Sequence, residues 1–78
     1  MQYYKICSKD FLYEIYFENW HGHKSVRFLQ VFTGPNGENF NSAKIIKCEE
    51  LEDIKNRTWI PEDVFIYAQR MYNLLVFN

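Results

Sequence analysis

Apolar and polar residues alternate along the first half of the chain, and this alternation predicts β-strands. The clearest strand covers residues 11–20, where one face carries the apolar side chains of Phe11, Tyr13, Ile15 and Phe17. The opposite face is mixed, with Leu12, Glu14, Tyr16, Glu18 and Trp20. Since apolar side chains gain from leaving water, we expect the first set to face the core and the second to face water or a partner.

The neighbouring segments complete an antiparallel hairpin arrangement. Residues 2–7 are rich in Tyr and Ile, which favour strands, and residues 8–10 predict a turn. Residues 21–24 contain Gly22 and fit a four-residue hairpin connection, after which residues 25–33 return as the next strand. One face of that strand carries Val26, Phe28 and Phe32, interrupted by Gln30.

The middle of the chain is ambiguous. Residues 34–37 read Gly-Pro-Asn-Gly, a strong turn signal. The apolar residues that follow fit either a third hairpin strand or a helix that begins near Ser42, because Ile45, Cys48, Leu51 and Ile54 recur every three residues. We favour a strand up to about Lys47, followed by a short helix over residues 49–56.

The last third of the chain predicts a helix over residues 61–76. Pro61 suits the first helical position, and two acidic residues follow it in the first turn. Apolar residues then recur at helical spacing at Val64, Tyr67 or Ala68, Met71 and Leu75. Trp59 and Ile60, just before the helix, are expected to pack against its start.

These elements predict an α+β fold. We expect a small antiparallel sheet of three to four strands, with the C-terminal helix packed on one face and the short second helix as an optional element before it. The length of 78 residues fits a single domain that spans residues 1–78. One covered face leaves the other face of the sheet open.

Composition and charge narrow the function classes. A net charge of -1 disfavours nucleic-acid binding by bulk electrostatics, and an apolar fraction of 47% disfavours disorder. No apolar run reaches the roughly 18 residues of a membrane span. The charged first 19 residues do not resemble a signal peptide. We therefore expect a cytoplasmic protein whose two cysteines, Cys7 and Cys48, are free thiols.

The candidate catalytic and metal-binding residues form no convincing constellation. His21, His23 and the two cysteines are acceptable zinc ligands, but their spacing lacks a compact knuckle. Glu14 and Glu18 lie about 13 Å apart on one extended strand, too far for a paired-carboxylate mechanism. No serine or cysteine lies in a nucleophile elbow. We therefore expect no catalytic residues, metal or cofactor, and a function other than catalysis.

The aromatic residues, 19% of the chain, exceed what one small core can bury, so some should form a surface patch. We expect a non-enzymatic protein-binding module, of the kind that small phage or mobile-element inhibitors use to bind and block a host protein. The acidic cluster near residue 50 offers a second contact surface. The expected partner-binding residues are Glu14, Tyr16, Glu18, Trp20, His21, His23, Glu49, Glu50, Glu52 and Asp53.

Two alternatives from other classes stay open. Lys24, Arg27, Lys44 and Lys47 could share one sheet surface with aromatic residues, as in a single-stranded nucleic-acid-binding domain. The balanced charge makes this the weaker hypothesis. A homodimeric structural protein is the nearest competitor, because a small sheet can cover its bare face with a second copy.

Overall fold

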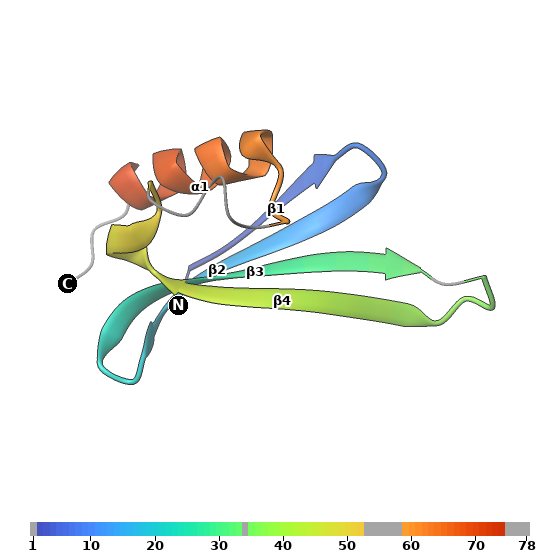
Figure 1. Ribbon diagram of the computed structural model, residues 1–78, viewed down its shortest axis with the longest axis horizontal. Helices are drawn as coiled ribbons and strands as arrows, with labels where there is room; N and C mark the ends of the chain where they lie inside the picture. The colour runs from blue at the N-terminus through green and yellow to red at the C-terminus, as the bar shows by residue number, and fades with distance from the viewer. Residues whose placement is uncertain (1, 34, 53–58, 75–78) are drawn as a thin grey trace.

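A computed structural model describes residues 2–33, 35–52 and 59–74 of the chain. The sheet is a four-stranded antiparallel meander in the order β1-β2-β3-β4, and a single α-helix lies over one of its faces (Figure 1). This arrangement confirms the α+β prediction. The elements are β1 (Gln2–Ser8), β2 (Phe11–Trp20), β3 (His23–Thr33), β4 (Asn39–Lys47), the 3₁₀ turn η1 (Cys48–Glu50) and α1 (Glu62–Leu74).

The β2–β3 connection is shorter than predicted. Only His21 and Gly22 lie between the strands, with φ of 51° and 79°. Positive φ at both central residues is what a two-residue type I′ turn requires, and its twist matches that of the flanking strands. His23 and Lys24, expected in the loop, already belong to β3, where His23 pairs with Trp20. The predicted four-residue connection is therefore wrong.

The sheet register confirms the predicted alternation. In β2, Tyr13, Ile15 and Phe17 are all buried under the helix side of the sheet. Their partners in β3 are Gln30, Phe28 and Val26. Directly opposed residues point to the same face, so the apolar halves of both strands form one surface. The buried core consists of Tyr13, Ile15, Phe17, Val26, Phe28, Ile46, Cys48, Leu51, Ile60, Val64, Phe65 and Ala68.

Two residues on this face depart from a simple apolar pattern. Gln30 interrupts it because its Nε2 donates a hydrogen bond of 2.9 Å to the hydroxyl of Tyr13, the residue opposite. A buried phenol that lacked this partner would be costly. Phe11, expected in the core, is 37% exposed and packs edge-to-face on Phe32. The prediction for Phe11 is wrong because β2 extends past the part of the sheet that the helix covers (Figure 1).

The start of α1 is held to the sheet by polar contacts. The helix begins at Glu62, one residue later than predicted, and the Phe65 N–H donates to the Pro61 carbonyl at 3.0 Å. The buried Ser8 hydroxyl lies 2.9 and 2.7 Å from the two carboxylate oxygens of Asp63 and donates to that group. This contact joins the end of β1 to the first turn. The predicted continuation to residue 76 passes Leu74 into residues outside the described ones.

The helix packs through a face that the sequence pattern only partly identified. Val64 and Ala68 are buried as expected, and Phe65 is buried beside them. The Phe65 ring stacks on Phe28 with centroids 5.9 Å apart and planes inclined by 11°. Ile60 is also buried, whereas Trp59 remains 43% exposed and stacks on Tyr13. The Phe28–Phe65 stack therefore holds the helix against the middle of β3.

The predicted short helix is represented by η1. This turn closes with a hydrogen bond of 3.2 Å from the Leu51 N–H to the Cys48 carbonyl. Leu51 is buried, and the Gln69 side-chain amide donates to its carbonyl at 3.4 Å. Residues 53–56, the second half of the predicted helix, lie outside the described ones.

The helix covers only one face and only one end of the sheet. It lies near the β2–β3 turn, while the β3–β4 end projects beyond it (Figure 1). Across the described residues, no helix combines the length and apolar content that a membrane crossing needs.

Replacing Phe65 by Ala should cost about 3–5 kcal/mol of unfolding free energy, because it removes a buried ring and leaves a cavity. That is a large part of the roughly 5–15 kcal/mol that stabilises a typical domain. Ile66→Ala, one position away and 39% exposed, is the matched control and should cost far less. Urea denaturation measures both, and equal losses would contradict the assigned packing face.

Candidate functional site

The sheet face opposite the helix, here called the open face, carries one row of side chains that crosses all four strands. Tyr3 pairs with Tyr16, Tyr16 with Arg27, and Arg27 with Ile45. Because paired residues point to the same side of a sheet, these four side chains stand next to one another. The row therefore joins β1, β2, β3 and β4 across the open face.

Aromatic and cationic contacts hold the row together. The rings of Tyr3 and Tyr16 stack with centroids 4.6 Å apart and planes inclined by 18°. The Arg27 guanidinium lies 4.5 Å from the Tyr16 centroid, and the Lys5 ammonium lies 5.5 Å from that of Tyr3. A cation therefore flanks the tyrosine pair on each side. Each aromatic or cation–π contact contributes about 0.5–1.5 kcal/mol.

Two carboxylates fix the ends of these side chains. The Tyr3 hydroxyl donates to Glu14 Oε2 at 2.7 Å, and the Tyr16 hydroxyl donates to Glu14 Oε1 at 3.4 Å. Arg27 Nε lies 3.2 Å from Glu18 Oε1, which makes an ion pair. That nitrogen has no partner of hydrogen-bonding geometry among the described residues, so the contact with Glu18 is one of charge.

The same surroundings shift the tyrosine pKa values. Burial raises the pKa of the Tyr16 phenol above 10.0, and the Glu14 charge adds to that rise. The pKa of Tyr3 is raised by partial loss of solvent and by its hydrogen bond to Glu14. Both phenols therefore keep their protons, and so remain hydrogen-bond donors, throughout the neutral range.

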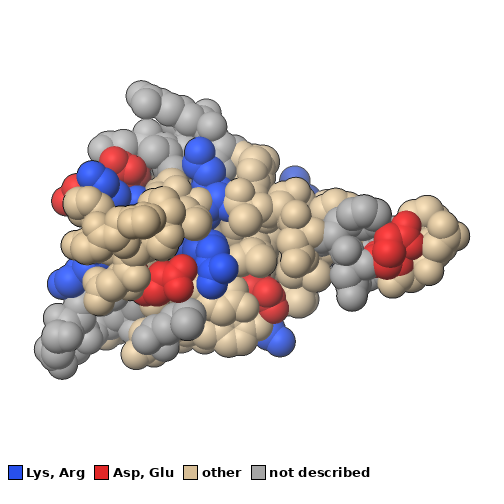
Figure 2. Space-filling view, turned by 90° about the horizontal axis from the view of Figure 1, so that it is seen from below, with Lys and Arg blue, Asp and Glu red and all other residues tan. Residues whose placement is uncertain are grey.

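Beside the row lies an apolar patch, defined by Leu12, Leu29, Val31 and Ala43. The register places Leu12 opposite Val31 and Leu29 opposite Ala43, all on the open face. Ala43 is exposed, and the other three are partly exposed. Acidic and basic groups are interspersed over this face rather than gathered into a field of one sign (Figure 2). A face of this composition resembles the core and rim of a protein interface.

Trp20 stands at the opposite end of the open face, next to the β2–β3 turn. It is 48% exposed, and its ring meets that of His21 edge-to-face with centroids 4.3 Å apart. Trp20 also borders a hollow of about 230 Å³ together with His23 and Glu50. The structure thus brings the predicted turn residues close to η1, which follows far along the chain.

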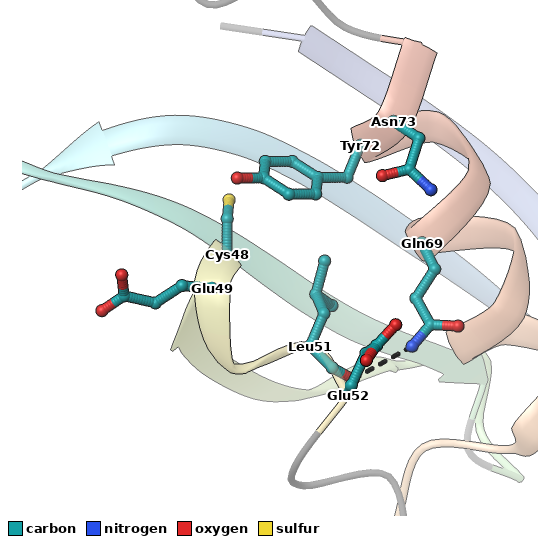
Figure 3. Close-up of a pocket in the computed structure, with 7 residues that line it drawn as sticks. All are labelled: Cys48, Glu49, Leu51, Glu52, Gln69, Tyr72 and Asn73. Carbon is teal, nitrogen blue, oxygen red and sulfur yellow. Dashed lines mark hydrogen bonds between the residues drawn. The ribbon is translucent and has the colours of Figure 1, made fainter.

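The acidic residues lie around η1 rather than on a solvated helix. Glu49 and Glu52 border a hollow of about 170 Å³ between η1 and α1, where Tyr72 and Cys48 meet and Gln69 reaches across to Leu51 (Figure 3). Glu50 points instead toward the hollow beside Trp20. Asp53 lies outside the described residues.

Most of the predicted partner-binding residues are therefore grouped. The open face carries Glu14, Tyr16, Glu18, Trp20 and His23, with His21 in the adjoining turn. Sequence reasoning missed Tyr3, whose role depends on the pairing of β1 with β2.

The expectation that four basic residues could share one surface is only half right. Arg27 and Lys47 lie on the open face, whereas Lys44 pairs with Phe28 and Lys24 with Asn19 on the helix side.

The histidines and cysteines come from different parts of the fold, with His21 in the β2–β3 turn, His23 in β3, Cys7 in β1 and Cys48 in η1. No group of three or more His, Cys, Asp or Glu side chains that could hold a metal occurs in the described parts of the chain. Cys7 is an exposed free thiol, and Cys48 is a buried one. Burial raises the pKa of Cys48 to about 11, against a smaller opposite effect of the Lys24 charge, so its thiol stays protonated.

Comparison with protein-family models, with curated proteins and with solved structures found no match to the chain. The geometry of the open face therefore carries the functional argument.

Alkaline pH should weaken the fold through the two tyrosines of the row. A phenol whose pKa is raised on folding adds stability that is complete below its unfolded pKa of 10.0 and is lost as the pH rises through the folded value. Tyr16→Phe should flatten the fall in unfolding free energy above pH 10. Ile66→Ala on the helix, which removes no phenol, is the control and should leave the shape of that fall unchanged. Urea melts across this range measure the difference, and identical pH profiles would refute the assignment.

The two cysteines should differ sharply in reactivity. At pH 8 an aromatic disulfide reagent should modify Cys7 at the rate of an exposed thiol, and Cys48 only after unfolding, because the thiolate is the reacting form. Cys7→Ser should leave a native protein with almost no fast-reacting thiol. Rapid modification of this variant without denaturant would show that Cys48 is accessible.

Proposed function

We propose that the chain is a protein-binding module that contacts a partner protein through its open face. The observation that supports this proposal is the row of Tyr3, Tyr16 and Arg27, which Glu14 and Glu18 hold in place without a partner. Tyr, Trp and Arg are the residue types that dominate binding energy at protein interfaces. The apolar patch beside the row supplies surface that a partner can cover.

Preorganisation is the physical reason to favour this role. Binding normally costs about 0.5–1.5 kcal/mol for each long side chain that becomes immobile. Here the ring stack, the cation–π contact and the carboxylate contacts already restrict the side chains. The side chains of the open face are therefore ordered before binding, and a partner loses little further side-chain entropy when it binds them.

The proposed consequence of binding is steric. A rigid face that covers part of a partner's surface closes that surface to the partner's other ligands. The inhibitor hypothesis derived from the size and balanced charge of the chain is of this kind, with a host protein as the target. We place this event in the cytoplasm, where the free Cys7 and Cys48 thiols would persist.

Single-stranded nucleic acid is the second candidate, and one observation favours it. Stacked tyrosines beside an arginine form the kind of platform on which bases stack. However, Glu14 and Glu18 stand against the same row and would repel phosphates. We therefore rank a protein partner first.

Affinity capture from a host lysate tests the proposal, with captured proteins identified by mass spectrometry. Trp20→Ala and Tyr3→Ala should each lower recovery of one stoichiometric protein about tenfold or more, as loss of an interface hot spot does. Ile66→Ala, on the outer side of the helix, is the matched control and should bind like the parent chain. Nuclease treatment should not change the result.

The other outcomes separate the alternatives. Capture that disappears with nuclease would favour the nucleic-acid hypothesis. A chain that sediments as a dimer, and dissociates when Tyr3 or Trp20 is replaced, would mean that a second copy covers the open face. Equal capture by all variants would contradict the assigned surface.

A further inference from the structure

The outer edge of β4 presents backbone groups that no other part of the described chain pairs. β4 is the last strand of the sheet, so β3 is its one neighbour there. The helix lies toward β1 and leaves β4 at the free margin of the sheet (Figure 1). Outside the helices and strands, the backbone hydrogen bonds among the described residues lie at η1 and at the start of α1. The outward N–H and C=O groups of β4 are therefore available to another strand.

The turn between β2 and β3 determines which residues of β4 carry these groups. Two residues separate the strands, so Trp20 and His23 on either side of the turn exchange backbone hydrogen bonds. The direction of hydrogen bonding alternates along a strand, so the even-numbered residues of β3 bond toward β4. These residues pair with the even-numbered residues of β4. The residues of β4 whose backbone groups point outward are therefore Asn41, Ala43 and Ile45.

The two edges of the sheet differ in their protection against strand addition. On β1, the same alternation gives Lys5 a central outward position, and α1 packs on this strand through the edge-to-face contact of Tyr4 with Tyr67. β4 is an unbroken strand of 9 residues, with no proline and no bulge in its pairing with β3. Proline, bulges, covering elements and charged side chains are the usual means of closing an edge. Of these, β4 has charged side chains alone.

Lys44 selects the charge of the strand that can pair with β4. Its side chain is exposed on the helix side, opposite Phe28, and no ion pair joins it to another described residue. Side chains directly opposite one another on adjacent strands attract when their charges differ and repel when they match. Two copies of this chain paired about Ala43 or Lys44 would bring their Lys44 side chains diagonally or directly opposite. A strand from another protein, with a carboxylate at this position, is therefore favoured over a second copy.

We propose that an extended acidic segment of the partner protein pairs with the outer edge of β4 as a further antiparallel strand. Its backbone bonds to Ala43 and Ile45, and its carboxylate lies opposite Lys44. The residues on either side of the carboxylate then lie on the open face, beside the exposed side chains of Ala43 and Ile45, and should be apolar. The proposal rests on the protein-binding function argued above and specifies how the partner is bound.

The synthetic peptide Ac-Thr-Thr-Val-Glu-Val-Thr-Thr-NH₂ tests this inference on the whole chain, with binding followed by NMR titration. Its glutamate should lie opposite Lys44. Replacement of the glutamate by lysine should weaken binding about tenfold, because an attractive charge pair becomes a repulsive one. Lys44→Glu should reverse this preference. Arg70→Glu, the same charge change at an exposed position of α1, is the matched control and should keep the preference of the parent chain. Spectral dispersion verifies that both variants are folded.

Methylation of single backbone nitrogens in the peptide separates strand addition from other modes of binding. The N–H of the valine after the glutamate faces β4 opposite Ala43, so methylation of this nitrogen should weaken binding at least tenfold. The N–H of the glutamate points away from β4, and its methylation should change binding less than about twofold. The two peptides have the same composition and charge, so each is the control for the other.

Hydrogen exchange reports the edge directly. In the free chain the N–H groups of Ala43 and Ile45 should exchange with solvent faster than those of Ser42 and Lys44, which bond to β3. Saturation with the glutamate peptide should slow the exchange of Ala43 and Ile45.

The results that overturn this inference leave the open-face proposal intact. They are equal binding of the glutamate and lysine peptides, equal effects of the two methyl groups, or no saturable binding of any peptide. Slow exchange of the Ala43 N–H in the free chain that becomes fast on dilution would mean that a second copy occupies the edge, and would also overturn it. Capture of a partner that depends on Tyr3 and Trp20 would still support binding through the open face, without strand addition.

Discussion

The stack of Phe65 on Phe28 is the contact on which the rest of the structure depends. It fixes the only α-helix of the described residues against one face of the sheet, and that face becomes the core. Because side chains alternate along a strand, every residue out of phase with Phe28 then belongs to the open face. Tyr16, Arg27 and Trp20 are surface residues for this reason, despite their size.

Alternation could predict the two faces but not the row of side chains across the strands. The predicted four-residue turn would pair Trp20 with Ser25, and Tyr16 would then stand opposite Leu29. The observed two-residue turn shifts this pairing and sets Tyr16 opposite Arg27 instead. The stacked row therefore depends on the left-handed backbone of His21 and Gly22, a local conformation that the hydrophobic pattern does not encode.

The hollows that His23 and Lys47 border could be predicted even less from the sequence. They need the β2–β3 turn and η1 at the same end of the sheet, and β4 brings them together by returning alongside β3. By periodicity the segment after residue 38 fitted both a strand and a helix, and the favoured strand up to about Lys47 is present as β4. Only the pairing with β3 resolves that ambiguity, and pairing is a long-range interaction. His23 and Lys47 thus border the same hollows because β3 and β4 pair, and that pairing joins segments far apart in the sequence.

The central row of Tyr3, Tyr16 and Arg27 determines how a partner can use the open face. In the central row the hydroxyls of Tyr3 and Tyr16 and the charge of Arg27 are already matched by carboxylates, so a partner can cover them without leaving a new unpaired group. Such a surface provides contact area but discriminates little between one partner protein and another. The central row therefore contributes affinity for a partner more than selectivity between partners.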